Sequence, residues 1–377
     1  MPATSRLALA AFALLLTRPL TAQDGTIVYR LGRDTVAIEQ FTRTSTRFAG
    51  DMVARNGAAV IRTQYDLTLA NGRVTAATVK RTAADGSALP NTPSEYRFTF
   101  RADSATRTLV FADSQPSRTF AAPNAFPALP VFAYAALELL RARTPHDSVP
   151  AIPLAGNGVG YTGIEAFRAD TLRLRGGPYA MSLVFDGKGA LQSTNGAYTT
   201  NKAIGLRSNG KVDVAAIART MKPTGVLSPR QVAFVSITQA PIMINYGSPA
   251  VRGRTVWGGA LIPQDSIWRT GANEATLLAA SRPLQFGSLT VPAGLYSLWT
   301  QVTANGVSLI VNKATGQWGT QYDAAHDLGR VSLEMAAADQ FTEDFTITLR
   351  ALTGPRGVLE LAWGDKKASA PFQVMPR

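Results

Sequence analysis

The strongest constraint on the fold is a recurring pattern of short runs in which apolar and polar residues alternate, each ending in a turn signal. Residues 96–101 (YRFTFR) place an aromatic ring at every second position, so one face of an extended segment is apolar. Residues 61–69 follow the same period, and Asn71 and Gly72 then supply a hairpin turn with positive φ. Similar turn signals stand at 32–34, 85–86, 176–177 and 186–189. A period of two is that of a β-strand, so we expect a mainly β protein with antiparallel strands.

One segment departs from this period. Residues 131–143 (VFAYAALELLRAR) carry apolar side chains at helical spacing, and Pro130 precedes them where proline favours a helix start. One apolar helix among many strands predicts a curled antiparallel sheet, half-barrel-like, with one packed helix. This order of elements resembles the half-barrels of periplasmic lipoprotein carriers, which hold acyl chains between sheet and helix. The helix either fills the concave face or borders a ligand cavity, and we favour filling because packed interiors are commoner than large cavities.

The distribution of tryptophan indicates two units. All five tryptophans lie after residue 228, and the segment around Pro223 and Gly225 favours neither helix nor strand. We expect an antiparallel β domain over 23–222, a linker over 223–229 and a second domain over 228–377. Each unit is long enough to bury its own core.

The first 22 residues have the pattern of a secretory signal peptide. Arg6 supplies the positive charge, residues 7–16 (LALAAFALLL) form the apolar segment, and a small residue precedes the expected cleavage point. This apolar run is too short to span a bilayer, which requires about 20 residues. A buried N-terminal helix is the alternative, but Arg18 and Pro19 follow the run directly. We therefore expect a periplasmic or secreted protein that does not span the membrane, and without cysteine it has no lipid-anchor residue.

Composition excludes several kinds of site. The chain has no cysteine, which excludes disulfides, thiolate zinc sites and cysteine nucleophiles. Its two histidines, His146 and His326, are too few for a histidine metal triad, so we expect no metal or cofactor. The net charge of +13 suits nucleic acid, but the arginines are dispersed along strands and not gathered with stacking aromatics. We expect no nucleic-acid partner.

Two patterns resemble catalytic or cofactor-binding motifs, but the sequence around each does not fit the motif. Residues 158–163 spell G-x-G-x-x-G, but Pro150 and Pro153 are incompatible with the buried strand that a dinucleotide fingerprint requires. No G-x-S-x-G elbow accompanies the histidines, so a serine triad has no expected nucleophile. These motifs therefore assign no activity.

Residues 228–377 contain a set of short motifs rich in tryptophan, glycine and arginine. They are residues 246–249 (YGSP), 252–254 (RGR), 257–259 (WGG), 268–276 (WRTGANEAT), 292–298 (PAGLYSL), 312–313, 318–319, 322–323 and 363–364. Together they resemble the bacterial domain-of-unknown-function family 2911. The resemblance implies a compact β-sandwich and carries no established activity. Strand-like runs at 286–291, 296–302, 307–312, 345–349 and 358–363, separated by Gly, Pro and Asn, agree with a sandwich.

Polar and aromatic residues of this unit that a sandwich does not need form the candidate site. They are Arg252, Arg254, Trp257, Trp268, Arg269, Asn273, Glu274, Asn312, Lys313 and His326. In one interpretation Arg269 and Glu274 form a buried ion pair that clamps a loop, so that Glu274→Gln costs about 3 kcal/mol of stability. In the other, Trp257 and Trp268 stack on a sugar or peptide ligand that Arg269, Asn273 and Glu274 hydrogen-bond. We favour the clamp.

These observations predict an exported envelope protein of unknown function that is not an enzyme and binds a small hydrophobic ligand, glycan or lipid. The alternatives are a hydrolase acting on envelope material and a purely structural or assembly protein. A hydrolase requires Glu274 in an open cleft as acid or base, beside His326 or Asp323. Glu274 buried against Arg269 or Arg254 favours the structural role instead.

Overall fold

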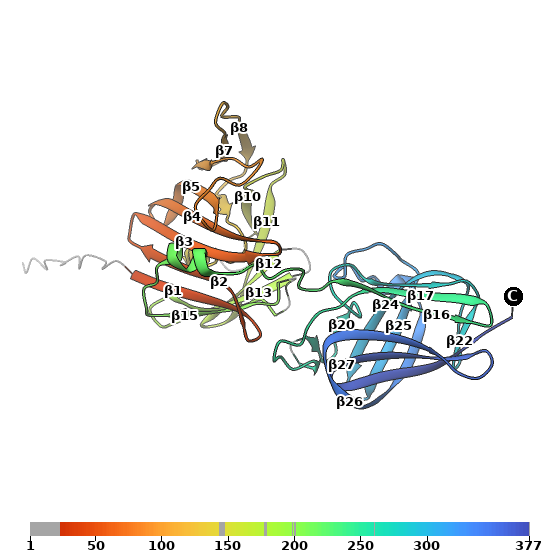
Figure 1. The fold of residues 1–377 in the computed structure, drawn as a ribbon. Helices are drawn as coiled ribbons and strands as arrows, with labels where there is room; N and C mark the ends of the chain where they lie inside the picture. The colour runs from red at the N-terminus through yellow and green to blue at the C-terminus, as the bar shows by residue number, and fades with distance from the viewer. Residues whose placement is uncertain are drawn as a thin grey trace, which may run out of the picture.

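The computed structural model describes residues 23–142, 148–176, 179–197, 199, 201–259 and 261–376. The expected signal peptide (1–22), His146 and the last residue of the predicted helix, Arg143, lie outside the described residues. The rest of the chain is mainly β, as predicted, and forms two large sheets (Figure 1). Within the described residues, no helix is long and apolar enough to cross a membrane.

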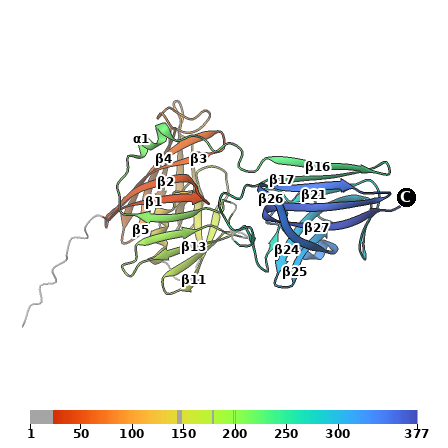
Figure 2. The same cartoon turned by 60° about the horizontal axis from the view of Figure 1, so that its bottom comes forward.

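The first sheet has fifteen strands in the described chain, in the order β8-β7-β6-β5-β4-β3-β2-β1-β15-β14-β13-β12-β11-β10-β9. Their bounds are Gln23–Leu31 (β1), Asp34–Arg43 (β2), Arg47–Asn56 (β3), Ala59–Ala70 (β4), Arg73–Ala83 (β5), Glu95–Phe100 (β6), Ser104–Val110 (β7), Ser117–Ala121 (β8), Phe126–Ala128 (β9), Ser148–Pro153 (β10), Gly160–Arg168 (β11), Thr171–Gly176 (β12), Tyr179–Phe185 (β13), Leu191–Asn195 (β14) and Ile204–Ser208 (β15). Neighbouring strands are antiparallel except β9 and β10. The sheet is therefore two meanders joined where β1 pairs with β15. It curls strongly without closing (Figure 2).

The sequence periodicity located these strands correctly. Residues 61–69 lie within β4 and 96–101 begin within β6, and Asn71 and Gly72, both at positive φ, turn β4 into β5. The glycines at 158–163 lead into strand β11, where a dinucleotide fingerprint requires a helix. The prediction that Pro150 and Pro153 exclude a strand before these glycines is wrong, because both prolines lie in β10, which pairs with β9 and β11. Alternation determines strands here because each strand has one face on the core and one face in water.

The predicted helix is present, but it starts later and is a 3-10 helix, η1 (Ala135–Ala142). Phe132 has φ 73°, which is incompatible with a helix beginning at Val131. Ala136, Leu139 and Leu140 are buried in the same core as the concave side of the sheet. A cavity of about 280 Å³ remains beside the helix, lined mainly by apolar residues such as Leu137 and Leu140. The helix thus packs onto the sheet and also borders a small apolar cavity.

A fully buried carboxylate, Glu39 of β2, fixes the start of η1. Its oxygens accept hydrogen bonds from the hydroxyls of Tyr29 (2.5 Å) and Tyr65 (2.6 Å). They also accept from the backbone N–H groups of Tyr134 (3.1 Å) and Ala135 (2.9 Å). Burial raises the pKa of Glu39 to about 7, although the four donors oppose this shift. Glu39 therefore joins the helix start to β1, β2 and β4.

A second buried carboxylate, Glu138, anchors the middle of η1. It accepts a hydrogen bond from the backbone N–H of Leu191 at 2.9 Å and forms an ion pair with Arg207 at 3.6 Å. It also pairs with Arg43. A buried charge is tolerated when it is paired and hydrogen-bonded in this way.

A short helix that the sequence analysis did not predict, α1 (Val214–Thr220), follows β15. The side chain of Asp213 caps it by accepting the N–H of Ala216 at 2.9 Å. Its buried residues Val214 and Ala218 pack with Val53 of β3 in a small separate cluster. Residues 221–229 then form neither helix nor strand and lead to the second sheet.

The second sheet has ten strands in the described chain, in the order β16-β17-β21-β24-β25-β26-β27-β22-β23, with β20 paired to β24. Their bounds are Arg230–Ile237 (β16), Ala240–Gly247 (β17), Ile267–Trp268 (β20), Thr276–Ala280 (β21), Leu284–Phe286 (β22), Leu289–Val291 (β23), Gly294–Thr303 (β24), Gly306–Asn312 (β25), Asp327–Ala351 (β26) and Arg356–Val374 (β27). A parallel pair, Trp257–Gly258 (β18) and Ile262–Pro263 (β19), and the 3-10 turn Ala324–His326 (η2) lie outside it.

The long strands β26 and β27 let this sheet fold back on itself as the predicted sandwich. Their pairing shifts register twice between Ala337 and Thr346, which allows the hairpin to bend. Inward side chains of β17, β24 and β25 share one core with those of β22 and β27. The predicted run 286–291 is two strands and not one, because Gly287 at φ 55° turns the chain between β22 and β23.

Candidate functional site

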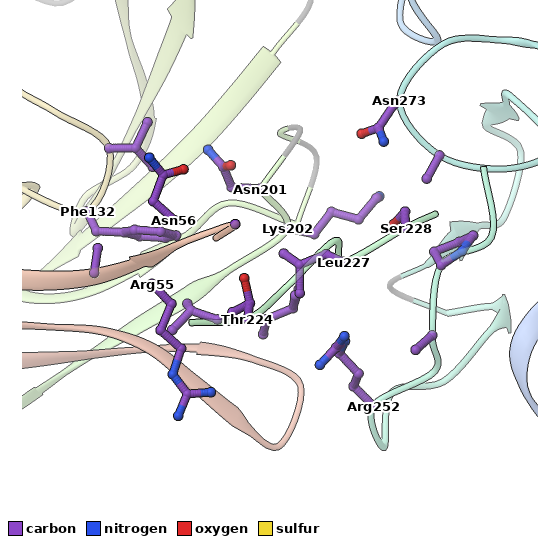
Figure 3. A pocket seen from close by; sticks show the side chains of 18 of the residues that line it. Arg55, Asn56, Phe132, Asn201, Lys202, Thr224, Leu227, Ser228, Arg252 and Asn273 are labelled. Atoms are coloured by element: carbon purple, nitrogen blue, oxygen red, sulfur yellow. The ribbon is translucent and has the colours of Figure 1, made fainter. Parts of the chain in front are cut away.

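A cavity of about 430 Å³ lies where the concave side of the first sheet faces the loops of the second sheet (Figure 3). The first sheet and its connections contribute mainly apolar residues together with Arg55, Asn56, Thr63, Arg81, Asn201 and Lys202. The second contributes Ser228, Arg252, Arg254, Arg269 and Asn273, with Trp268 and Trp363 at its base. This volume is in the range of small-molecule sites.

Direct contacts between the two sheets hold the cavity walls together. The turn between β1 and β2 places the N–H of Arg33 3.0 Å from the carbonyl oxygen of Arg252, and Arg252 forms an ion pair with Asp34. Arg33 also lies 3.7 Å from Glu343. Gly32 has φ 62°, and a Cβ there would lie 2.1 Å from the Arg252 carbonyl oxygen. Only glycine fits this contact.

Two loops of the second unit carry its cationic residues into the cavity. The first follows β17 and bends at Arg252 and Gly253, which both have positive φ. The second follows β20 and bends at Thr270, Gly271 and Asn273. Backbone of this kind does not continue a strand, so the side chains project from the sheet edge.

Close packing behind these loops fixes Arg269. Its guanidinium donates a hydrogen bond to the carbonyl oxygen of Asn273 at 3.1 Å. Gly319 lies directly beneath it, since a Cβ there would be 2.1 Å from Arg269 Cδ. Gly247 is equally close to the carbonyl oxygen of Ala272, at 2.3 Å. The Tyr-Gly-Ser-Pro and Trp-Gly motifs therefore supply glycines where the two loops and the sheet touch.

Three cations converge in the cavity: Lys202, Arg254 and Arg269. Burial, together with the positive charges of Arg269 and Arg254, lowers the pKa of Lys202 to about 8. Lys202 Nζ donates a hydrogen bond to the carbonyl oxygen of Ala197 at 3.1 Å. Burial and the charge of Arg252 lower the pKa of Arg254 to about 10, with Glu343 and Asp34 partly offsetting the shift. Figure 3 shows Lys202 extending between the two sides of the cavity.

The cavity lining contains no Asp, Glu or His among the residues that the structure describes. Within that part of the chain, neither Lys202 nor Arg254 has a carboxylate within 4.0 Å, whereas Arg252 pairs with Asp34. The buried Nε of Arg81 has no hydrogen-bond partner among the described residues. The described ranges also hold no group of three His, Cys, Asp or Glu side chains placed to bind a metal. The cavity is therefore strongly positive and suited to an anion.

Five of the ten predicted site residues line this cavity: Arg252, Arg254, Trp268, Arg269 and Asn273. Trp268 nevertheless belongs to the core, since it is 6% exposed and stacks on Trp363 with ring centroids 5.5 Å apart. It also meets Phe345 edge to face at 4.9 Å. Trp268 therefore lines the cavity as part of the core and offers no open stacking surface.

The predicted ion-pair clamp between Arg269 and Glu274 is wrong. Glu274 is 53% exposed and pairs with Arg230 at 3.5 Å. Arg269, by contrast, is buried. The two side chains separate because Asn273, at φ 65°, turns the chain between them, and β16 brings Arg230 beside Glu274.

The other predicted residues lie outside the cavity. Trp257 donates its indole N–H to the carbonyl oxygen of Trp363 at 2.9 Å, and Lys313 is exposed. Asn312 is buried and donates to the carbonyl oxygen of Asp323 at 2.8 Å. His326 is exposed and its Nδ1 lies 3.1 Å from Asp323.

The arrangement expected for a hydrolase is not found either. Within the described residues, no hydrogen bond or ion pair joins Glu274 to His326 or to a second carboxylate. Asn312, Asp323 and His326 instead share a turn that ends β25.

The first unit contributes cavity residues that the sequence does not indicate. Lys202 and Arg81 are two among many cationic residues of a basic chain, and no motif marks them. Phe132 was assigned to the apolar face of the predicted helix, whereas it precedes η1 and faces the cavity (Figure 3). The distances along the chain gave no signal that these residues lie together.

Comparison with known proteins supports the resemblance for the second unit. Residues 228–372 match the family model described as "Protein of unknown function (DUF2911)". No curated protein and no solved structure matches the chain. The match therefore covers the second sheet and the cavity residues that come from it, and it does not include the first sheet.

Proposed function

We propose that the cavity between the two sheets binds a small organic anion and that the protein is a non-catalytic binding protein. The observation that carries this proposal is the convergence of Lys202, Arg254 and Arg269 in a lining with no described acidic residue. An anion placed among them relieves mutual repulsion and replaces lost hydration with charge-assisted hydrogen bonds. A neutral glycan or an uncharged lipid gains neither.

The same lining argues for binding and against acid–base catalysis. A hydrolase of the kind considered above uses a carboxylate or imidazole as a proton acceptor beside the reacting bond. Among the described lining residues there is neither group. Lys202 is the one described lining side chain with a pKa lowered to a value as close to neutrality as about 8. Its neighbours are cations, which is the environment of an anion site.

We further propose that the protein acts in the cell envelope after export, as a periplasmic or secreted protein. The support is the pattern of Arg6 followed by the apolar residues 7–16. Intact-mass analysis of protein recovered from the periplasm or medium should give a chain that begins at Gln23. Recovery of only the uncleaved chain from the cytoplasm contradicts export.

Calorimetry with the full mature chain tests anion binding. Acetate, octanoate, citrate, inorganic phosphate and methyl phosphate are titrated at low ionic strength, with glucose and octanol as uncharged controls. We expect one or more anions to bind and to raise the melting temperature, since a ligand of the native state stabilises it. Uncharged controls should not bind.

Charge variants identify the site. Lys202→Met should lower the affinity for the anion at least tenfold, because it removes a desolvated charge. Lys202→Arg keeps the charge and should retain binding. Arg350 lies exposed on β26 outside the lining, so Arg350→Gln provides a charge-matched control. Equal loss in Lys202→Met and Arg350→Gln, or binding of the uncharged controls alone, contradicts the proposal.

A further inference from the structure

We infer that the anion carries a hydrocarbon chain, so that the ligand is an amphiphile with one charged group and one apolar tail. This inference rests on the proposed function and adds the class of ligand. It follows from a group of apolar side chains that lies on one side of the cavity.

The charged group belongs on the side of the second sheet. Arg254 and Arg269 come from its two loops, and Lys202 reaches them from the opposite wall, since both arginines act on its pKa. Asn273 lies on the same loop as Arg269 and faces the cavity (Figure 3). The charges of Lys202, Arg254 and Arg269 and the Asn273 amide therefore favour one small anionic group at this side of the cavity.

The tail belongs on the side of the first sheet. On that side the cavity is lined by Leu31, Val36, Met52, Ile61 and Phe132, together with the polar residues named above, Arg55 and Arg81 among them. The five apolar residues stand on β1 to β4 and on the turn before η1, along the concave side that curls around the helix. These five apolar side chains add no binding free energy for phosphate, or for acetate with its single methyl group. They do favour a ligand with a hydrocarbon chain, because the chain leaves water when it packs against them.

Phe132 has the most specific position on this wall. Its φ of 73° is uncommon for a bulky residue, and its ring lies 5.4 Å from that of Tyr29 and 6.0 Å from that of Tyr134. The turn before η1 therefore holds the ring at the cavity side of the core. Glu39 fixes this turn through Tyr134 and Ala135.

A chain-length series on the mature protein tests the inference. Acetate, butyrate, hexanoate, octanoate and decanoate are titrated calorimetrically, with butyl and octyl phosphate beside inorganic phosphate to compare head groups. We expect affinity to rise by up to about fourfold per added methylene, the gain from removing one CH₂ from water. The alkyl phosphates distinguish a lipid-like phosphate from the free ion.

Two variants separate tail from head. Phe132→Ala should lower the affinity for octanoate severalfold and leave the affinity for acetate or phosphate unchanged. Lys202→Met should lower the affinity for every anion. Phe234 is 62% exposed on β16 outside the lining, so Phe234→Ala is the matched control and should change nothing.

The outcomes distinguish this inference from the function on which it rests. If short and long anions bind equally and depend on Lys202, the anion site stands and the tail inference is overturned. If affinity rises with length but Phe132→Ala has no effect, the tail lies elsewhere, for example in the apolar cavity beside η1, and the inference is also overturned. If no anion binds, the proposed function itself fails.

Discussion

Glu274 lies half exposed beside Arg230, and this position changes the expected effect of removing its charge. A solvated ion pair contributes about 0–1 kcal/mol, whereas the buried pair expected from the sequence would contribute about 3 kcal/mol. Glu274→Gln should therefore lower the free energy of unfolding by less than about 1 kcal/mol. All five tryptophans lie in the second unit, so urea denaturation followed by tryptophan fluorescence reports on it directly. A loss of unfolding free energy near 3 kcal/mol would instead support the buried ion pair between Arg269 and Glu274.

Lys202 gives anion binding a defined pH dependence. Its pKa is lowered from 10.5 to about 8, so the free protein loses this charge as the pH rises through about 8. A bound anion favours the ammonium form, so binding takes up a proton as the pH rises above about 8. Affinity for octanoate should fall between pH 7.5 and pH 9.5, by up to tenfold per pH unit. Lys202→Met should remove this slope, and an unchanged slope would assign the proton to another group.

At the scale of elements, η1 depends on the buried carboxylate of Glu39. The folded pKa of Glu39 is raised to about 7 from 4.5, so its contribution to stability is fully present below about pH 4.5 and is lost as the pH rises through about 7. The hydroxyl of Tyr65 limits this loss by donating to the carboxylate at 2.6 Å. The hydrogen bond from Tyr65 therefore contributes most to stability at a pH where Glu39 is ionised.

Tyr65→Phe should accordingly destabilise the first unit by about 1.5–3 kcal/mol at pH 8, the range for a hydrogen bond to a charged group. At pH 5.5 the loss should be nearer 1 kcal/mol, because the folded carboxyl is then protonated. Urea denaturation followed by far-ultraviolet circular dichroism measures both values. Tyr161 is 59% exposed, and Tyr161→Phe serves as the control. A larger loss at pH 5.5 than at pH 8 would contradict the assigned charge state.

At the scale of the whole molecule, the contact of Gly32 with Arg252 holds the two sheets together at the cavity. Gly32→Ala places a methyl group 2.1 Å from the Arg252 carbonyl oxygen and should separate the walls. Anion binding should fall more than tenfold. Gly72 has a similar φ of 72°, nothing within 4 Å of an added Cβ and no place in the cavity lining, so Gly72→Ala carries comparable backbone strain without the clash. Equal binding by the two variants would show that the sheet contact is not needed.

The separate core of the second sheet leads to a prediction for a fragment of the chain. Residues 228–377 should fold alone with a cooperative melting transition, because the sandwich encloses its own core around Trp363, Phe345 and Trp268. The fragment should not bind octanoate, since Lys202 and Phe132 are absent from it. If the fragment melts in a broad, non-cooperative transition while the full chain melts sharply, the domain boundary at residue 228 is contradicted.

The sequence alone determined what neighbours along the chain control. Alternation and turn residues located strands such as β4 and β6, because strand faces and tight turns depend on a few successive residues. The motifs of the second unit resemble the family model that residues 228–372 match. The apolar segment 131–143 was also recognised. Its late start at Ala135 was not, because Glu39, about a hundred positions earlier, holds the turn before it.

Only the tertiary structure decided which charges meet. Arg230 pairs with Glu274 in place of Arg269, and Lys202 approaches Arg254 and Arg269 across the boundary between the two sheets. Electrostatic energy depends on the distance between charges and on their burial, and both are fixed by strand order, loop conformation and the docking of Gly32 on Arg252. A basic chain supplies many equivalent cations, and only folding selects the few that share one buried cavity.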